Sequence, residues 1–269
     1  MTRLFIITLF ILSTTYSQAQ LNWVYNMKEA QALSLNENKL ILLDFWASWC
    51  GPCRNMDDKL WGAPEISEVA HKFIPFKVDV DVNQDLAGKY GIKGIPTVIL
   101  ITANGDVVWK KSDFSSAKVY LDFFKTLPED ISVLNEKITP VLMDNKNSQA
   151  YLDLGMAYQK TGIQLKNTKL KNAFLKLSNS YFKQANKKDS TGALTGKTAL
   201  LSILNEAYKG NVKKVRKKLG KMKAASLDKE LQELKQFIVA YCYKCEGDKV
   251  QLASSKAEIT NTQFLAQLE

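Results

Sequence analysis

The feature that most constrains this chain is an apolar segment, residues 40–46, which is followed almost at once by Cys50 and Cys53. An unbroken apolar run bounded by polar residues predicts a buried central strand. Pro52 fits the first turn of a helix, where its missing N–H costs nothing. The sequence therefore predicts a strand–helix unit with a Cys-x-x-Cys pair at the junction.

The flanking segments predict an alternation of strands and helices up to Pro128. A helix is expected over residues 27–36, before the central strand. The patterns then indicate a helix from Cys50 to about Leu60, a helical piece at 64–71, a strand at 73–82, a helix at 85–90, a strand at 97–102, a strand at 107–109 after the Asn104-Gly105 turn, and a helix capped by Ser115 or Ser116 that ends near 126.

Strand patterns stop after residue 128, and apolar residues then recur at helical spacing. We expect roughly five to seven antiparallel helices there. The pattern Tyr151-x-x-Leu154-Gly155-x-x-Tyr158 resembles the first helix of a tetratricopeptide-type repeat. No clean repeat period accompanies it, so a divergent helical repeat and a plain helical bundle both stay open.

The first nineteen residues have the pattern of a secretory signal peptide. Arg3 gives a positive start, residues 4–12 are largely apolar, and Ser17 and Ala19 are small residues that suit a signal peptidase. We expect cleavage after Ala19, a periplasmic or otherwise exported protein, and no stable membrane insertion after cleavage. The alternative is an uncleaved anchor, for which the apolar segment is short. The chain thus divides into residues 1–19, 20–127 and 128–269.

Charge is unevenly distributed. Residues 1–127 hold as many acidic as basic residues, so the whole formal net charge of +10 lies in residues 128–269. A basic face attracts acidic partners or anionic lipid heads. The interpretation we favour is a solvated, lysine-rich helical surface, and we expect no nucleic-acid partner.

Cys50 and Cys53 have the spacing that thiol–disulfide exchange requires, in which one thiolate attacks and a second thiol resolves the mixed disulfide. Cys50 is expected to be the nucleophile, because a helix N-terminus lowers the pKa of a thiol. Cys53, one turn further on, is expected to be less exposed and to resolve. A zinc site needs two more cysteines or histidines, and the sole histidine is His71. We expect neither a metal nor a cofactor.

Two motifs give residues 22–127 a resemblance to the thioredoxin family. Residues 44–53, Asp-Phe-Trp-Ala-Ser-Trp-Cys-Gly-Pro-Cys, are similar to the family's active-site segment, and residues 90–97, Tyr-Gly-Ile-Lys-Gly-Ile-Pro-Thr, are similar to its second motif. The resemblance implies an α/β thioredoxin fold, a central mixed sheet flanked by helices. An all-α helical domain, which the resemblance does not cover, is expected to follow.

The resemblance also implies roles for individual residues. Asp44 matches the buried carboxylate that handles the proton of the resolving cysteine, and Lys77 matches the lysine that partners it. Pro96 matches the cis-proline that faces the disulfide, and Trp49 matches the aromatic residue that shields it. The residues expected to contact substrate are Trp49, Gly51, Pro52, Ile95 and Pro96.

Residue chemistry agrees with these roles. Burial raises the pKa of an aspartate in an apolar strand, and Lys77 opposes that shift, which favours a general base near neutral pH. The alternative is an Asp44 turned to solvent. A cis Pro96 exposes the backbone of Ile95 for strand-like pairing with a substrate, and the alternative is an ordinary trans turn.

Two stretches depart from the family pattern. Residues 60–70 are longer and more broken than in the small cytosolic thioredoxins, and are more similar to exported relatives, including the thioredoxin-like ends of membrane electron-transfer reductases. The glycine often found before the last helix is replaced around Ser112-Asp113. The shape of one substrate-facing loop therefore stays open.

A second Cys-x-x-Cys pair, Cys242 and Cys245, lies in the helical half. It lacks the strand, tryptophan and proline that accompany the first pair. Three interpretations stay open: small buried side chains, a structural disulfide, or a redox relay partner of the first pair.

The sequence supports two hypotheses for function. In the first, the protein is an exported thiol–disulfide oxidoreductase. It reduces disulfides of exported proteins and takes electrons from a membrane or periplasmic thiol donor; the alternative direction is oxidation of client thiols. In the second, the protein is a redox-sensitive binding or scaffold protein whose helical domain docks a partner.

Overall fold

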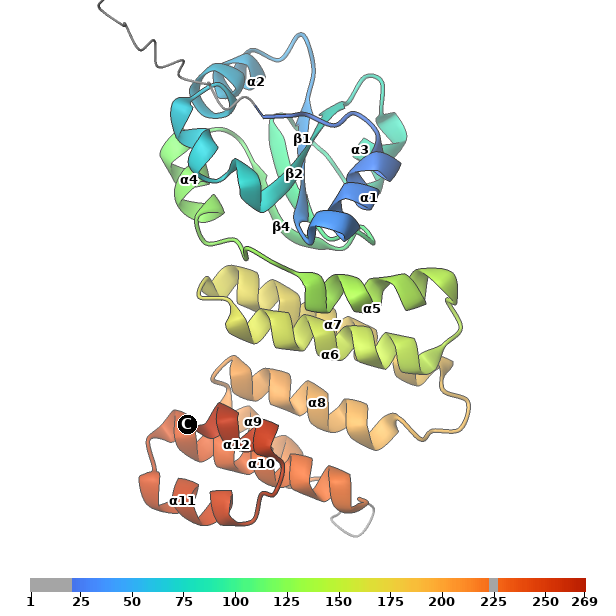
Figure 1. Cartoon of the computed structure of the whole chain (residues 1–269), viewed down its shortest axis with the longest axis vertical. Coiled ribbons are helices and arrows are strands. Elements are labelled where there is room, and N and C mark those ends of the chain that lie inside the picture. Colours follow the sequence, from blue (N-terminus) through green and yellow to red (C-terminus); the bar gives the residue numbers. More distant parts are fainter. Residues whose placement is uncertain (1–20, 223–226) are drawn as a thin grey trace, which may run out of the picture.

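The computed structural model describes residues 21–222 and 227–269, so the predicted signal peptide lies outside the described residues. A four-stranded sheet with helices on both faces comes first, and a stack of helices follows along the long axis of the molecule (Figure 1). The expected order, a mixed sheet with helices followed by an all-α region, is confirmed.

The sheet is formed by β1 (Leu40–Trp46), β2 (Phe73–Asp79), β3 (Thr97–Ile101) and β4 (Val107–Ser112), in the spatial order β2-β1-β3-β4. β1 runs parallel to β2 and antiparallel to β3, and β3 pairs antiparallel with β4. β1 is a buried inner strand with the boundaries that the apolar run predicts, and Asp44 is its one ionisable residue.

The two faces of the sheet are covered by different helices (Figure 1). α1 (Met27–Glu37) and α3 (Gln84–Lys89) pack on one face, and α2 (Gly51–Met56) and α4 (Ala117–Phe124) pack on the other. Because side chains alternate along a strand, odd-numbered residues of β1 face the first pair of helices and even-numbered residues face the second. Asp44 therefore lies on the same face as the helix that carries the cysteines.

Two predicted boundaries in this part are wrong. β2 ends at Asp79 rather than at Val82, because the Asp79 carboxylate accepts a hydrogen bond from the Asp81 backbone (2.9 Å) and turns the chain. The single helical piece expected at 64–71 is instead two 3₁₀ turns, Pro64–Glu68 and Ala70–Lys72.

Residues 128–269 contain more helices than expected. The described residues form eight rather than five to seven, because several short helices are separated by turns that the apolar pattern does not mark: α5 (Ser132–Met143), α6 (Ser148–Gln164), α7 (Thr168–Lys188), α8 (Thr195–Tyr208), α9 (Val212–Leu219), α10 (Lys229–Glu246), α11 (Lys249–Ala257) and α12 (Thr262–Leu268). Within the described part of the chain, no helix combines the length and the hydropathy of a membrane span.

α6 and α7 form a closely packed pair. A Cβ atom at Gly155 would lie 2.6 Å from the ring of Phe182, and one at Gly162 would lie 3.0 Å from Phe174, so both positions require the absence of a side chain. This close approach is a packing reason for the Leu-Gly-x-x-Tyr pattern of α6. The similarity of that pattern to a tetratricopeptide repeat stays a prediction.

The turn between β3 and β4 is attached to the helical region by hydrogen bonds that are buried or partly buried. The Asp106 carboxylate accepts hydrogen bonds from the hydroxyls of Tyr158 and Tyr181, both at 2.6 Å, and from the Asn104 amide at 2.9 Å. The Tyr158 hydroxyl also lies 3.1 Å from Thr102 Oγ1. One cluster of buried side chains extends from the α2–α4 face of the sheet through α5, α6 and α7 to α12. The two halves of the chain therefore share a core.

Candidate active site

Cys50 and Cys53 form a disulfide at the start of α2. Cys50 is the N-cap residue of α2, and the backbone N–H of Cys53 points at the Cys50 sulfur from 3.1 Å. An amide at this position stabilises a thiolate on Cys50. Cys50 is 3% exposed and Cys53 is 2% exposed, so the expected difference in exposure is small in the disulfide form.

The disulfide packs in a small apolar cluster. Ala47 is buried beside it, and Trp46, Val80 and Ile95 pack against it from three different segments. The Ile95–Pro96 peptide bond is cis. The second motif recognised in the sequence thus lies against the cysteines.

Trp49 lies next to the dithiol and is 66% exposed. Its indole Nε1–H donates a hydrogen bond to Asp81 Oδ2 at 2.9 Å, which holds the ring on the loop that follows β2. Gly51 and Pro52 are exposed in the first turn of α2. Of the five residues expected to contact substrate, Trp49, Gly51 and Pro52 therefore lie on the surface beside the cysteines, whereas Ile95 is half-buried and Pro96 is buried.

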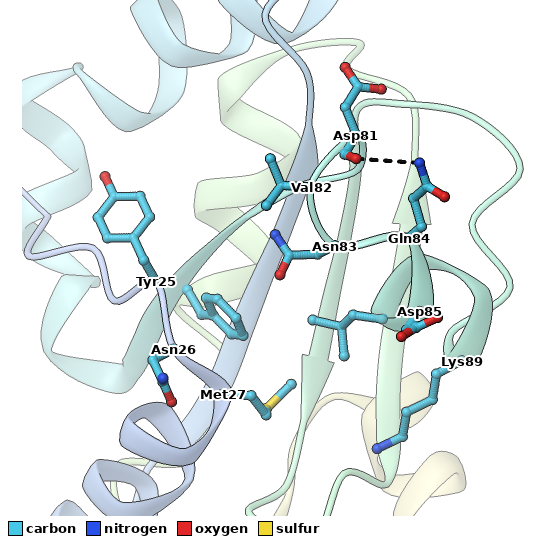
Figure 2. A pocket seen from close by; sticks show the side chains of 11 residues that line it. Tyr25, Asn26, Met27, Asp81, Val82, Asn83, Gln84, Asp85 and Lys89 are labelled. Atoms are coloured by element: carbon cyan, nitrogen blue, oxygen red, sulfur yellow. Dashed lines mark hydrogen bonds between the residues drawn. The ribbon is translucent and has the colours of Figure 1, made fainter.

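A hollow of about 690 Å³ is lined by residues of the β2–α3 loop and of the segment that leads into α1 (Figure 2). Tyr25 and Val82 project at its rim and are 71% and 78% exposed, and the buried Phe76 lies among its lining residues. Asp81 lines the hollow and also accepts the Trp49 hydrogen bond. Asp81 is therefore the residue that links this hollow to the surroundings of the dithiol.

Asp44 and Lys77 meet beneath α2. They face each other across the parallel register of β1 and β2, and Lys77 Nζ lies 3.1 Å from Asp44 Oδ2. Asp44 is 2% exposed, so the alternative of a solvent-facing carboxylate is wrong. The pKa of Asp44 is raised to about 6. Burial is the largest cause; the charge and hydrogen bond of Lys77 oppose it, and the charge of Asp57 adds to it. Asp44 is therefore largely ionised at neutral pH and accepts a proton readily near that pH.

Two residues of this centre, Asp57 and Trp61, were missed by the sequence reasoning. Asp57 makes an ion pair with Lys77, and Trp61 Nε1–H donates a hydrogen bond to Asp44 Oδ2 at 3.0 Å. Both belong to Asp57–Trp61, a π-helical segment that continues α2. The signal was the spacing of four from Cys53 to Asp57 and from Asp57 to Trp61, which places all three on one side of a helix.

Two tryptophans lie over the Lys77 ammonium group, and a third packs against one of them. The ammonium group lies 4.9 Å from the ring centroid of Trp23 and 5.3 Å from that of Trp46, at cation–π distance. Trp61 packs edge-on against Trp23 at 5.4 Å. The charges beneath the dithiol are therefore enclosed by aromatic rings, which exclude water and strengthen electrostatic interactions.

Asp113, in the stretch that departs from the family pattern, has a positive φ of 79°. Its backbone N–H donates to the Pro96 carbonyl at 3.0 Å, and its carbonyl accepts from the Tyr120 hydroxyl at 2.5 Å. The backbone at position 113 thus keeps a conformation that favours glycine, although the residue there is an aspartate. The carboxylate pairs with Lys111 at 2.9 Å.

Cys242 and Cys245 are free thiols in the C-terminal turns of α10. Burial raises the pKa of both, that of Cys242 to about 11. Because both thiols are free, a structural disulfide between Cys242 and Cys245 is not observed. A raised pKa makes both thiols poor nucleophiles. No group of three or more potential metal ligands occurs in the described ranges, and His71 contacts Glu129.

Comparisons with known proteins match the first half of the chain. The thioredoxin family model matches residues 23–126. A thioredoxin of Chlorobaculum thiosulfatiphilum is 42% identical over 78 residues, which are 28% of this chain and 67% of that protein. Thioredoxin 2 of Chlorobaculum tepidum is 45% identical over 75 residues, 26% of this chain and 63% of that protein. The thioredoxin of Haemophilus influenzae is 39% identical over 87 residues, 31% of this chain and 75% of that protein.

Solved structures overlap with the same fraction of the chain. A DsbH oxidoreductase is 23% identical with a TM-score of 0.38, and covers 45% of this chain and 92% of its own. The C-terminal domain of DsbD from Neisseria meningitidis is 26% identical with a TM-score of 0.33, and covers 38% of this chain and 90% of its own. With its Cys50–Cys53 disulfide, its matching family model and its curated relatives, this chain belongs to the thioredoxin family.

Proposed function

We propose that the protein is an exported thiol–disulfide oxidoreductase that reduces disulfides of other exported proteins through Cys50 and Cys53. The observation that carries the proposal is the dithiol at the N-terminus of α2, placed above a buried Asp44 that is paired with Lys77. Activation of a thiol and removal of a proton are the two requirements of dithiol exchange.

The reaction has two exchange steps. In the reduced protein the Cys50 thiolate attacks one sulfur of the client disulfide, forms a mixed disulfide and releases the first client sulfur as a thiolate. Cys53 then loses its proton to Asp44, and its thiolate attacks Cys50. The Cys50–Cys53 bond forms, the mixed disulfide breaks, and the second client sulfur leaves. The client gains two electrons: the second client sulfur takes the Cys53 proton from Asp44, and the first client thiolate takes a proton from water. The protein is left in the disulfide form of this structure.

The exposed surface around the cysteines supports a protein client. Trp49, Gly51 and Pro52 are exposed beside the disulfide, and the half-buried Ile95 packs against it. Exposed aromatic and apolar residues of this kind mark contact surfaces for other proteins. A hollow that Tyr25 and Val82 border is lined by Asp81, the hydrogen-bond partner of Trp49 (Figure 2).

Repeated turnover requires a supply of electrons, because each cycle leaves Cys50 and Cys53 oxidised. The predicted signal peptide puts the protein outside the cytoplasm, so we propose a membrane or periplasmic thiol protein as donor. The direction of reaction is measurable as the reduction potential of the dithiol. A value near that of the glutaredoxins or lower supports a reductase, and a value near that of the strong periplasmic oxidants contradicts it.

The test is reduction of insulin disulfides by the mature chain in the presence of dithiothreitol. We expect Cys50→Ser to abolish catalysis and Cys53→Ala to accumulate a mixed disulfide with its clients. Cys245→Ser is the matched control, because Cys245 is an exposed cysteine on α10, and it should retain full activity. Catalysis that survives in Cys50→Ser would contradict the proposal.

A groove in the helical region favours a second function, that of a redox-sensitive binding protein. It has a volume of about 690 Å³, lies between α6, α8, α10 and α12, and is lined in part by Met156, Ile163, Leu201, Leu234, Phe237 and Phe264. Hydrogen exchange of the reduced and disulfide forms tests this function. If the helices around the groove exchange identically in both forms, the groove does not respond to the dithiol and this alternative fails.

A further inference from the structure

The two oxygens of Asp44 have different surroundings. Oδ2 lies 3.1 Å from Lys77 Nζ and accepts the indole N–H of Trp61 at 3.0 Å. Oδ1 is buried and has no hydrogen-bond partner among the described residues. Both donors that reach the carboxylate therefore bind the same oxygen.

An unpaired buried oxygen is rare in proteins, because burial of a polar atom without a partner costs about 1–3 kcal/mol. On a carboxylate, this oxygen is also where a proton is most easily added, because no donor competes for its lone pairs. Exchange at Cys50 and Cys53 requires such a proton acceptor.

We propose that Trp61 is a positioning residue for proton transfer: its N–H, together with Lys77, holds Oδ2 and leaves Oδ1 as the oxygen that takes the proton of Cys53. This inference rests on the proposed function, in which Asp44 is the base. It adds which carboxylate oxygen of Asp44 accepts the proton, and it names Trp61 as the residue that leaves this oxygen available.

Packing fixes the Trp61 indole. The ring is 5% exposed, is stacked on Phe124 at 6.1 Å with an interplanar angle of 17°, and meets Trp23 edge-on at 5.4 Å. The π-helical segment that Trp61 ends is closed by a hydrogen bond from the Gly62 N–H to the Asp57 carbonyl at 2.7 Å. A Cβ atom at position 62 would lie 3.2 Å from that carbonyl oxygen, so the turn is tight.

The indole hydrogen bond also affects the equilibrium of the proton. An N–H donor stabilises the ionised carboxylate, whereas the protonated form gains less from it. Trp61 therefore lowers the pKa of Asp44, in addition to the larger lowering by Lys77, and both oppose the rise caused by burial. In the resolving step, the Cys53 proton moves to Oδ1, the Cys53 thiolate attacks Cys50, and the proton then passes from Oδ1 to the departing client thiolate.

The chain offers a matched control in Trp109. Trp61 and Trp109 both pack on Phe124, with ring centroids at 6.1 and 6.3 Å, within the same buried cluster. Only the Trp61 indole hydrogen-bonds to Asp44 among the described residues. Trp61→Phe and Trp109→Phe therefore make the same chemical change in the same core, and one of them removes the N–H from the carboxylate.

The experiment is an NMR titration of the Asp44 carboxyl carbon in the disulfide form of the mature chain. We expect Trp61→Phe to raise the pKa of Asp44 by about one unit, the size expected for a hydrogen bond to a charged group, and Trp109→Phe to leave it unchanged. In the wild type, the Trp61 indole N–H resonance should titrate with the same midpoint as Asp44. This second measurement needs no variant, so it also decides the case if Trp61→Phe does not fold.

Three outcomes would overturn the inference. These are an unchanged Asp44 pKa in a folded Trp61→Phe variant, an equal rise in Trp109→Phe, or a Trp61 indole resonance that does not respond to the Asp44 titration. Because the titration involves no client, its result is separate from the proposed function, which fails instead if the wild type does not reduce disulfides. In single-turnover resolution of the mixed disulfide, the pH midpoint should rise in Trp61→Phe by as much as the Asp44 pKa.

Discussion

Lys77 Nζ lies 3.1 Å from Asp44 Oδ2, and the two residues are direct neighbours across β1 and β2. The ion pair does not fully offset the burial of the carboxylate, because the pKa of Asp44 is still raised from 3.8 to about 6. Folding therefore makes this aspartate a weaker acid, and the free energy of unfolding depends on pH as a result.

The Asp44→Asn variant should show this effect as a dependence of stability on pH. Between about pH 4 and pH 6 the folded protein binds more protons at Asp44 than the unfolded chain does, so the free energy of unfolding falls as pH rises through this window. Asparagine does not titrate. We expect the stability difference, variant minus wild type, to increase by about 2 kcal/mol from pH 4 to pH 7.5. Urea unfolding at both pH values measures it, and parallel pH profiles would contradict the prediction.

Asp57→Asn should lower the pKa of Asp44. The charge of Asp57 raises that pKa, and Asp57 also shares Lys77 with Asp44. Without this second carboxylate Lys77 interacts with Asp44 alone, so the pH profile of mixed-disulfide resolution should shift to lower pH. Asp58→Asn is the control, because it makes the same charge change on an exposed neighbouring residue. A shift of equal size in both variants would show that only net charge matters.

Asp113→Gly should stabilise the protein. A left-handed backbone conformation costs a residue with a side chain about 1–2 kcal/mol, and glycine offsets part of this gain through its more flexible unfolded state. The lost ion pair with Lys111 is exposed and contributes little. We expect the free energy of unfolding to rise by up to about 1 kcal/mol, with Asp113→Asn in between, because asparagine tolerates this conformation. If thermal and urea unfolding show a less stable glycine variant, the carboxylate stabilises the loop.

Asp106→Ala should weaken the junction between the two halves. It removes the acceptor that the hydroxyls of Tyr158 and Tyr181 and the Asn104 amide share. Tyr158 keeps Thr102 and Asn104 keeps the Tyr181 hydroxyl as partners, so the expected loss is that of about one unpaired donor, about 1–3 kcal/mol, in thermal unfolding followed by circular dichroism. Asp122→Ala, on the exposed side of α4, should change stability by less than about 1 kcal/mol. A small loss at Asp106 would mean that the junction depends on apolar packing alone.

Much of the first half could be predicted from local sequence. The apolar run predicts β1 to the residue, and the Cys-Gly-Pro-Cys segment predicts a helix start, because both depend on residues adjacent in the chain. The Ile95–Pro96 bond and the Asp44–Lys77 pair came from the family resemblance, since they join segments that are distant in sequence.

The remaining features depend on tertiary structure. Trp61 reaches Asp44 from a π-helical segment. Residue preferences do not predict the wider turn of such a segment. Asp113 adopts a positive φ because Pro96 and Tyr120 hold its backbone from both sides, and neither contact is visible locally. In the helical half, the apolar spacing identifies helices but not their number, because helices such as α11 and α12 are too short to show a clear apolar period.

The hydrogen bonds at Asp106 and the shared core also determine how a client can approach. The sheet and the helical stack share a core, and α8, α10 and α12 lie at the end of the molecule away from α2, which begins at the dithiol (Figure 1). Under the proposed function, a single client that contacts those helices and also presents a disulfide to Cys50 has to span that separation in this arrangement of the two halves.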